Sequence, residues 1–180
     1  MRKACFLDRD GVINVEVNYL HTPEETVLIP GTAEALRLLH KAGFLAVVVT
    51  NQAGVAKSLF PESDVGRVHR RIQELLAADH EKIDDFFYCP HHPDFTGRCD
   101  CRKPAPGMIL SAARKWDIDL KQSFLIGDRM SDITAGRNAD LAECYLVLTG
   151  YGETASRQPE AAGATLVKDP LAAVRDFLSR

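Results

Sequence analysis

The sequence lacks the features of a membrane protein, a secreted disulfide-rich protein or a nucleic-acid-binding protein. Its longest uninterrupted apolar stretch, Phe44–Val49, is far shorter than the ~20 residues that cross a bilayer. No signal peptide is recognisable in residues 1–10. Neither sign of charge prevails, since 22 Lys and Arg stand against 25 Asp and Glu, so no positive field attracts a polyanion. We therefore expect a cytoplasmic protein whose principal partner is neither a membrane nor a nucleic acid.

Cysteine is also too scarce for a disulfide framework. The chain has five cysteines, and an odd number in a cytoplasmic protein favours buried thiols or a metal site. Cys5 and Cys144 each lie alone in an apolar segment, which is typical of a buried thiol. A chain of 180 residues that is 46% hydrophobic can bury a core without disulfides. We expect one domain over residues 1–180, acting as a monomer.

Short apolar runs alternate with amphipathic helical patterns along most of the chain. The runs have the near-continuous apolar character of strands buried on both faces, and they are 4–7, 44–49, 83–88, 123–126, 144–148 and 165–167. The helical patterns are 32–41, 62–79, 107–115, 131–138 and 170–179. This alternation predicts a three-layer α/β/α sandwich with a mainly parallel, Rossmann-like sheet. Residues 151–180 are expected to complete the sheet without contributing to a site.

Polar residues follow several of the predicted strands, at the sheet edge where α/β proteins bind ligands. Asp8 and Asp10 follow the first strand, and two carboxylates at this spacing repel each other unless a cation lies beside them. Thr50 and Asn51 follow the second strand in a small polar turn that suits phosphate oxygens. Asp128 follows the fourth strand. Together these segments predict a site for a metal and a phosphate.

Each segment also has an ordinary structural interpretation. Asp8 and Asp10 could form a turn with the following glycine, and the residues after Thr50 could simply begin a helix. Asp132 could simply be a helix-start residue favoured by the helix dipole. Lys103, in the segment Cys-Arg-Lys-Pro before a helix, means little by itself.

The order of these segments resembles that of the haloacid dehalogenase (HAD) superfamily of phosphohydrolases, over residues 3 to about 150. Segments 6–14, 49–54, 89–93 and 99–104 are similar to those of D-glycero-D-manno-heptose 1,7-bisphosphate phosphatases. The nearest relatives of these enzymes are the histidinol-phosphate phosphatases. Larger members of the superfamily carry a cap domain. This chain has no room for one, so the resemblance implies an uncapped, open site.

The resemblance implies a role for each residue at the strand ends. Asp8 would be the nucleophile that forms an aspartyl phosphate. Asp10 would be the general acid and base, which calls for a raised pKa. Thr50 and Lys103 would hold the phosphoryl group. Asp8, the main-chain carbonyl of Asp10 and Asp128 would bind Mg²⁺, since all the donors are hard oxygens.

Cys89, His91, Cys99 and Cys101 offer three thiolates and an imidazole on a short irregular loop. This donor set is typical of a closed, structural zinc site, although free buried thiols are the alternative. The resemblance selects His91 rather than His92 as the fourth ligand. The zinc would fix the backbone that carries the following lysine.

The resemblance also implies a substrate and its contacts. These contacts are Glu16, Val17, Asn18, Tyr19, Asn51, Gln52, Ala53, Arg102 and Arg129. Two arginines favour a sugar bisphosphate over histidinol phosphate, whose ammonium group would prefer carboxylates. We therefore expect a phosphatase that removes the 7-phosphate of a heptose 1,7-bisphosphate, a precursor of lipopolysaccharide heptose. A histidinol-phosphate phosphatase and a non-catalytic, zinc-anchored phosphosugar-binding module remain the alternatives.

Overall fold

The computed structural model describes all of residues 1–180 and contains one parallel β-sheet. Its six strands lie in the order β3-β2-β1-β4-β5-β6, and every neighbouring pair is parallel. The strands are β1 (Lys3–Leu7), β2 (Phe44–Asn51), β3 (Asp85–Cys89), β4 (Phe124–Gly127), β5 (Glu143–Val147) and β6 (Thr165–Val167). The strand order reverses between β1 and β4, and this is the place where α/β sheets bind ligands.

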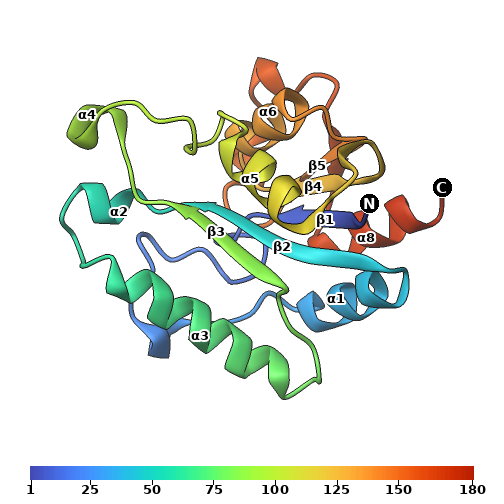
Figure 1. The fold of residues 1–180 in the computed structure, drawn as a ribbon, viewed down its shortest axis with the longest axis horizontal. Helices are drawn as coiled ribbons and strands as arrows, with labels where there is room; N and C mark the ends of the chain where they lie inside the picture. The colour runs from blue at the N-terminus through green and yellow to red at the C-terminus, as the bar shows by residue number, and fades with distance from the viewer.

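Helices cover both faces of the sheet, which confirms the predicted three-layer sandwich. Figure 1 shows α1 and α3 on one side of the sheet and α5 and α6 on the other. The longer helices are α1 (Thr32–Lys41), α3 (Ser63–Ala77), α5 (Gly107–Trp116), α6 (Met130–Asn138) and α8 (Pro170–Leu178). The short ones are α2 (Ala53–Ala56), α4 (Pro93–Thr96), α7 (Gly152–Ala155) and the 3-10 turns η1 (Pro23–Glu25), η2 (Leu120–Gln122) and η3 (Pro159–Ala161).

Alternate strand residues fill two cores, one on each face of the sheet. Leu7 and Val48 belong to the core that includes residues of α1, α3 and α8. Phe6 and Val47 belong to the core beneath α5 and α6. All four side chains are at most 2% exposed. Because both faces are covered, the central strands β1, β2 and β4 are mostly apolar, and this double core fixes the strand ends.

Glycine and aspartate set two of the helix ends as the sequence predicts. α1 covers the predicted residues, and Gly43 just beyond it has a φ of 79°, a left-handed conformation that glycine adopts at little cost. Asp169 caps α8, because its Oδ1 accepts a hydrogen bond of 2.8 Å from the Ala172 amide. Both ends lie within one residue of the prediction.

The predicted strand 83–88 is wrong at its start, since β3 begins at Asp85. Ile83 is buried, but its amide and carbonyl bond to the side chain of Gln73 in α3 rather than to a strand. Between β1 and α1 the chain forms a long loop with only η1 in it, and no cap domain interrupts the fold. No helix of the structure combines the length and the apolar character needed to span a bilayer.

Candidate active site and cysteine–histidine cluster

The sheet register brings the ends of β1, β2 and β4 to one edge. Leu7 pairs with Val48 on one side and with Ile126 on the other. Asp8 and Asp128 directly follow β1 and β4, and Thr50 lies in the last two residues of β2, so the three residues occupy neighbouring positions. The structure thus brings together the strand-end residues that the sequence singled out, as the parallel arrangement requires.

Lys103 places its ammonium group among these acids. Its Nζ lies 2.9 Å from Asp8 Oδ1 and 2.6 Å from Asp132 Oδ1, and it donates to the Val49 carbonyl at 2.7 Å. Burial lowers the pKa of Lys103, but the charges of Asp132 and Asp8 outweigh it and raise the pKa to about 12. Lys103 is 4% exposed, and a buried lysine stays charged only when it is paired in this way.

Asn51 fixes the backbone that carries this lysine. The Asn51 side chain donates to the Lys103 carbonyl and accepts from the Lys103 amide, both at 3.0 Å. Asn51 was predicted to contact substrate. The structure shows that its amide group is engaged in positioning Lys103, although the residue also lines the cavity.

Asp8, Asp128 and Asp132 offer carboxylate oxygens that lie within 4.8 Å of one another. Burial and the neighbouring carboxylates of Asp8 and Asp132 raise the pKa of Asp128 to about 8. Burial and the charges of Asp132 and Asp10 outweigh Lys103 and raise the pKa of Asp8 to about 6. The Asp128 Oδ1 atom is buried without a hydrogen-bond partner. Crowded carboxylates with a free buried oxygen fit a divalent cation with hard oxygen ligands.

Gly11 allows the loop after β1 to lie against Asp128. Its φ is 83°, and a Cβ atom there would lie 2.3 Å from Asp128 Oδ2. The same oxygen accepts a hydrogen bond of 2.8 Å from the Tyr151 amide. A larger residue at position 11 would therefore displace the Asp128 carboxylate.

The raised pKa expected for Asp10 is wrong for this structure. The Asp10 carboxylate accepts hydrogen bonds of 2.9–3.1 Å from Arg9, and further ones from Asn14 at 3.0 Å and Gln52 at 3.1 Å. Burial raises the pKa of Asp10, but the Arg9 charge and these hydrogen bonds together hold it below its usual value. Asp10 is therefore held as a carboxylate, ready to accept a proton.

Arg9 is the residue that the sequence did not reveal. Its side chain is fully buried, and its Nη2 also donates to the Leu20 carbonyl at 3.3 Å. Arg9 Nη1 and the Nε2 of His69 are both buried without a partner. The Arg9 charge contributes, after burial, to lowering the pKa of His69 to about 3. His69 is therefore a neutral imidazole beneath the site.

A cavity of about 430 Å³ opens over the strand ends. Its lining includes twelve of the predicted catalytic and substrate-contact residues, namely Asp8, Asp10, Glu16, Asn18, Tyr19, Thr50, Asn51, Gln52, Ala53, Arg102, Lys103 and Arg129. Val17 is not part of the lining, and its side chain is exposed. Burial and the Asp10 charge raise the pKa of Glu16 to about 7. The prediction thus anticipated most of the cavity wall.

The sequence missed several residues that also line this cavity. They are Gly54, Lys57, His92, Ser131, Asp132 and Tyr151. Tyr151 corrects the expectation that residues 151–180 stay out of the site, because its ring lies 3.8 Å from the Arg129 guanidinium. No local pattern marks Lys57 or Tyr151. The sequence favoured a helix-start role for Asp132, and the residue does have that role, since its Oδ2 accepts from the Arg129 amide at 2.9 Å.

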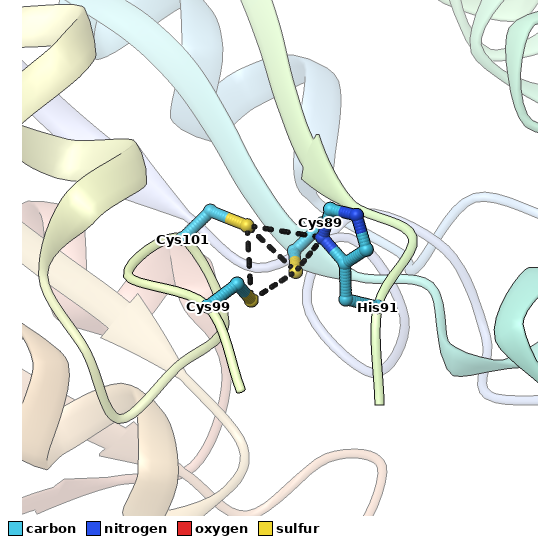
Figure 2. Close-up of side chains that lie close together, drawn as sticks. All are labelled: Cys89, His91, Cys99 and Cys101. Atoms are coloured by element: carbon cyan, nitrogen blue, oxygen red, sulfur yellow. Dashed lines mark hydrogen bonds between the residues drawn. The ribbon is translucent and has the colours of Figure 1, made fainter. Parts of the chain in front are cut away.

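Figure 2 shows the cysteine–histidine cluster, with Cys89 and His91 at the end of β3 and Cys99 and Cys101 on the returning loop. The three sulfur atoms lie 2.9–3.5 Å apart, and His91 Nδ1 lies 3.6–3.7 Å from two of them. Zn–S bonds of ~2.3 Å place tetrahedral ligands roughly 3.8 Å apart. The His91 distances match this spacing and the sulfur atoms lie closer together than it, so the four groups are gathered where they could hold a zinc ion.

His92 takes no part in this cluster. Its Nδ1 accepts a hydrogen bond of 3.3 Å from the Asp94 amide and so begins α4. The cluster is joined to the cavity wall by Arg102, whose Nη1 donates to the His91 carbonyl at 3.0 Å. Lys103 follows directly. The loop that holds the cysteines thus also holds the lysine that reaches Asp8.

Comparison with known proteins agrees with this geometry. A family model described as HAD-hydrolase-like matches residues 100–174. The chain is 41% identical to the D-glycero-beta-D-manno-heptose-1,7-bisphosphate 7-phosphatase of Pasteurella multocida over 154 residues. This aligned region covers 83% of this chain and 84% of that protein. It is 42% identical over 154 residues to a D-glycero-alpha-D-manno-heptose-1,7-bisphosphate 7-phosphatase of Photorhabdus laumondii, with the same coverage.

Among solved structures, one of D,D-heptose 1,7-bisphosphate phosphatase from B. bronchiseptica, complexed with magnesium and phosphate, superposes with a TM-score of 0.89. The two chains are 34% identical and each is covered to 98%. The fold and the acids at its strand ends thus define a phosphatase of the HAD-like hydrolases. Within that class, the chain belongs to the family of heptose-1,7-bisphosphate 7-phosphatases.

Proposed function

We propose that this protein removes the 7-phosphate from a D-glycero-D-manno-heptose 1,7-bisphosphate. The observation that carries the proposal is the pairing of Asp8 with Lys103 at 2.9 Å, beside a cavity that three unpaired cationic side chains also line. Family membership supports the reaction and the substrate. We propose that it acts on this small molecule as a cytoplasmic monomer, because an uncapped site needs no partner chain to complete it.

In the first step a carboxylate oxygen of Asp8 attacks the phosphorus atom, and the bond to the sugar oxygen breaks. The sugar oxygen takes a proton from Asp10. Lys103 and the Thr50 hydroxyl hold the phosphoryl oxygens as negative charge develops on them. The product of this step is an aspartyl phosphate on Asp8, with the dephosphorylated sugar hydroxyl free to leave.

In the second step water attacks the phosphorus atom and gives its proton to Asp10. The bond between phosphorus and the Asp8 oxygen breaks, which releases inorganic phosphate and restores the Asp8 carboxylate. The hydrogen bonds from Arg9, Asn14 and Gln52 favour the carboxylate form of Asp10, which this step requires. A bound phosphate dianion brings negative charge close to Asp10 and raises its pKa. Substrate binding thus favours the protonated form that the first step requires.

We propose that Asp8, Asp128 and the main-chain carbonyl of Asp10 hold Mg²⁺. When bound, the ion supplies positive charge against the phosphoryl oxygens and the crowded carboxylates. Asp132 is assigned a different role, because one of its oxygens pairs with Lys103 and the other accepts from the Arg129 amide. It therefore positions the lysine.

We propose that Cys89, His91, Cys99 and Cys101 hold a structural Zn²⁺. When bound, the ion cross-links the end of β3 to the segment that carries Arg102 and Lys103. Four protein ligands leave no open coordination position, so its part is to hold the loop rather than to take part in the chemistry.

The test is a phosphate-release assay with Mg²⁺ on four substrates: the α and β anomers of heptose 1,7-bisphosphate, histidinol phosphate and p-nitrophenyl phosphate. We expect kcat/KM for a heptose bisphosphate to exceed that for histidinol phosphate by at least about 10-fold, the value of one charge-assisted contact. Phosphorus NMR of the product should show a sugar 1-phosphate. A higher kcat/KM for histidinol phosphate would refute the substrate, and no turnover of any ester would favour the binding module.

A further inference from the structure

Lys57 is a basic residue of the cavity that belongs to none of the recognised motifs. It follows directly after α2 (Ala53–Ala56) and its side chain is half-buried. It lines the same cavity as Asp8 and Lys103. Because α2 begins where β2 leaves the sheet, Lys57 is held at a fixed position relative to the phosphoryl site.

Lys57 has no acidic partner. Its Nζ donates to the Tyr19 hydroxyl at 2.6 Å, and it lies 5.1 Å from the Tyr19 ring and 5.9 Å from the Phe95 ring. By contrast, Lys115 and Lys121, both on the surface, each pair with an aspartate. A cation that lines a polar cavity without a carboxylate is available to an anionic ligand.

The charged groups of the cavity divide into a paired set and an unpaired set. The paired set is the catalytic one, in which Asp8 is paired with Lys103 and Asp10 with Arg9. The unpaired cations are Lys57, Arg102 and Arg129, none of which forms an ion pair in the structure. Arg102 bonds a main-chain carbonyl and Arg129 stacks on an aromatic ring. A second phosphate would find its positive charge among these three.

Tyr19 adds a second hydrogen-bond donor beside the Lys57 ammonium group. Its hydroxyl oxygen accepts from Lys57, which leaves the hydroxyl hydrogen free to donate to another acceptor. Tyr19 has a φ of 60°, an unfavourable conformation for a residue with a bulky side chain. The chain keeps this backbone conformation at a position where the ring and hydroxyl line the cavity next to Lys57.

We infer that Lys57, with the Tyr19 hydroxyl, binds the phosphate that is not hydrolysed, and so makes the enzyme select a bisphosphate over a monophosphate. This inference rests on the proposed function, because it needs a substrate with two phosphates. Three elements converge on the lysine: α2, the loop after β1 and, through Phe95, the segment between the zinc ligands. A change in any of them would move the cation.

The test compares heptose 1,7-bisphosphate with p-nitrophenyl phosphate, which has one phosphate, in Lys57→Met, Lys57→Arg and Tyr19→Phe proteins. We expect Lys57→Met to lower the ratio of the two kcat/KM values by about 10- to 100-fold, mostly through a higher KM for the bisphosphate. Lys57→Arg should restore most of this ratio. Tyr19→Phe should lower it by about 3- to 10-fold, since it removes one neutral donor.

Lys41→Met is the matched control, because Lys41 is exposed on α1 and outside the cavity. It should leave the ratio unchanged, and equal melting temperatures would show that all the variants fold. If the wild-type protein does not prefer the bisphosphate, the proposed function itself fails. If it does prefer the bisphosphate and Lys57→Met keeps the ratio within about 2-fold, the function stands and the role of Lys57 is refuted.

Discussion

The two clusters of chemically active side chains in this protein are held in place in different ways. The acids and Lys103 lie at the ends of strands whose residues are buried on both faces of the sheet. The cysteine–histidine cluster begins at Cys89, the last residue of β3, and its other members lie in residues 90–101, where α4 is the only regular element. Figure 1 shows this loop extending beyond the end of β3.

The two clusters differ in the neighbouring groups that offset their charged or polar side chains. Lys103 offsets two carboxylates at the strand ends, and Arg9 offsets Asp10. The thiols form hydrogen bonds with one another, with His91 and with main-chain amides of the loop, and none is in an ion pair. The first site is therefore built mainly by packing and ion pairs. We propose that the second depends on a bound metal, because a loop with few buried apolar residues cannot fix itself.

The replacement Asp8→Asn should have the largest effect, and it separates the catalytic role of the strand-end site from its stability. It removes the nucleophile but keeps the side-chain shape, and we expect turnover to fall by at least about 10⁴-fold. The melting temperature should not fall, because the change removes a crowded buried charge. Phosphate release and thermal unfolding measure the two effects, and an active Asp8→Asn protein would refute the role of Asp8.

Lys103→Met tests whether ion pairing holds the strand-end site together. Loss of a charge that contacts the phosphoryl group should lower kcat by about 100- to 1,000-fold. It also leaves Asp8 and Asp132 without their cation, and breaking a buried pair destabilises a protein by about 3–5 kcal/mol. The exposed pair of Lys115 with Asp85 is the matched control, since Lys115→Met should cost less than about 1 kcal/mol. Equal effects of the two changes, measured by urea unfolding, would contradict the comparison.

Cys101→Ser tests the dependence of the loop on its metal. We expect the zinc content to fall from one ion per chain to almost none, and kcat/KM to fall by about 10- to 100-fold, as Lys103 loses its support. Far-ultraviolet circular dichroism should stay unchanged, because the sheet does not rest on the loop. Cys144→Ser, outside the cluster, should keep its zinc. Full activity in a zinc-free, folded protein would show that the metal has no part in positioning the lysine.

His69→Leu gives the smallest effect and tests the packing beneath the acids. Burial and the Arg9 charge lower the pKa of His69 to about 3, so the unfolded chain binds a proton below pH 6.5 that the folded chain does not bind. His69 therefore contributes a loss of stability as the pH falls from about 6.5 towards 3, and this contribution is about 2 kcal/mol at pH 5. His69→Leu should lack this loss, whereas the exposed Arg70→Leu control on α3 should retain it. If the stability of the His69→Leu protein and that of the Arg70→Leu protein depended on pH in the same way, His69 would be protonated in the folded protein.

Much of the strand-end site could be predicted because its residues follow strands. The apolar run Phe44–Val49 predicts the end of β2 to within two residues, since the strand continues to Asn51. Parallel strands bring Asp8, Thr50 and Asp128 to one edge whatever the loops do. The cluster around Cys99 was predictable for another reason, since its ligands are close in sequence and of a rare type.

The remaining site residues depend on contacts that no local pattern encodes. Arg9 lies between two expected site residues, yet its burial and its effect on Asp10 arise only when the loop carrying Leu20 folds over it. Tyr151 reaches the site through a turn after β5 that brings its amide to Asp128. Nothing in the sequence around Lys57 separates it from an ordinary surface lysine. Only its position in the wall of the folded cavity does so.

The most direct test is a crystal of the protein soaked with Mn²⁺, a cation of the same charge as Mg²⁺ that scatters X-rays anomalously. We predict an anomalous peak between the carboxylates of Asp8 and Asp128, next to the main-chain carbonyl of Asp10, and its loss in an Asp128→Ala crystal. A peak elsewhere in the cavity, or an occupied site that survives Asp128→Ala, would show that these strands do not share one cation.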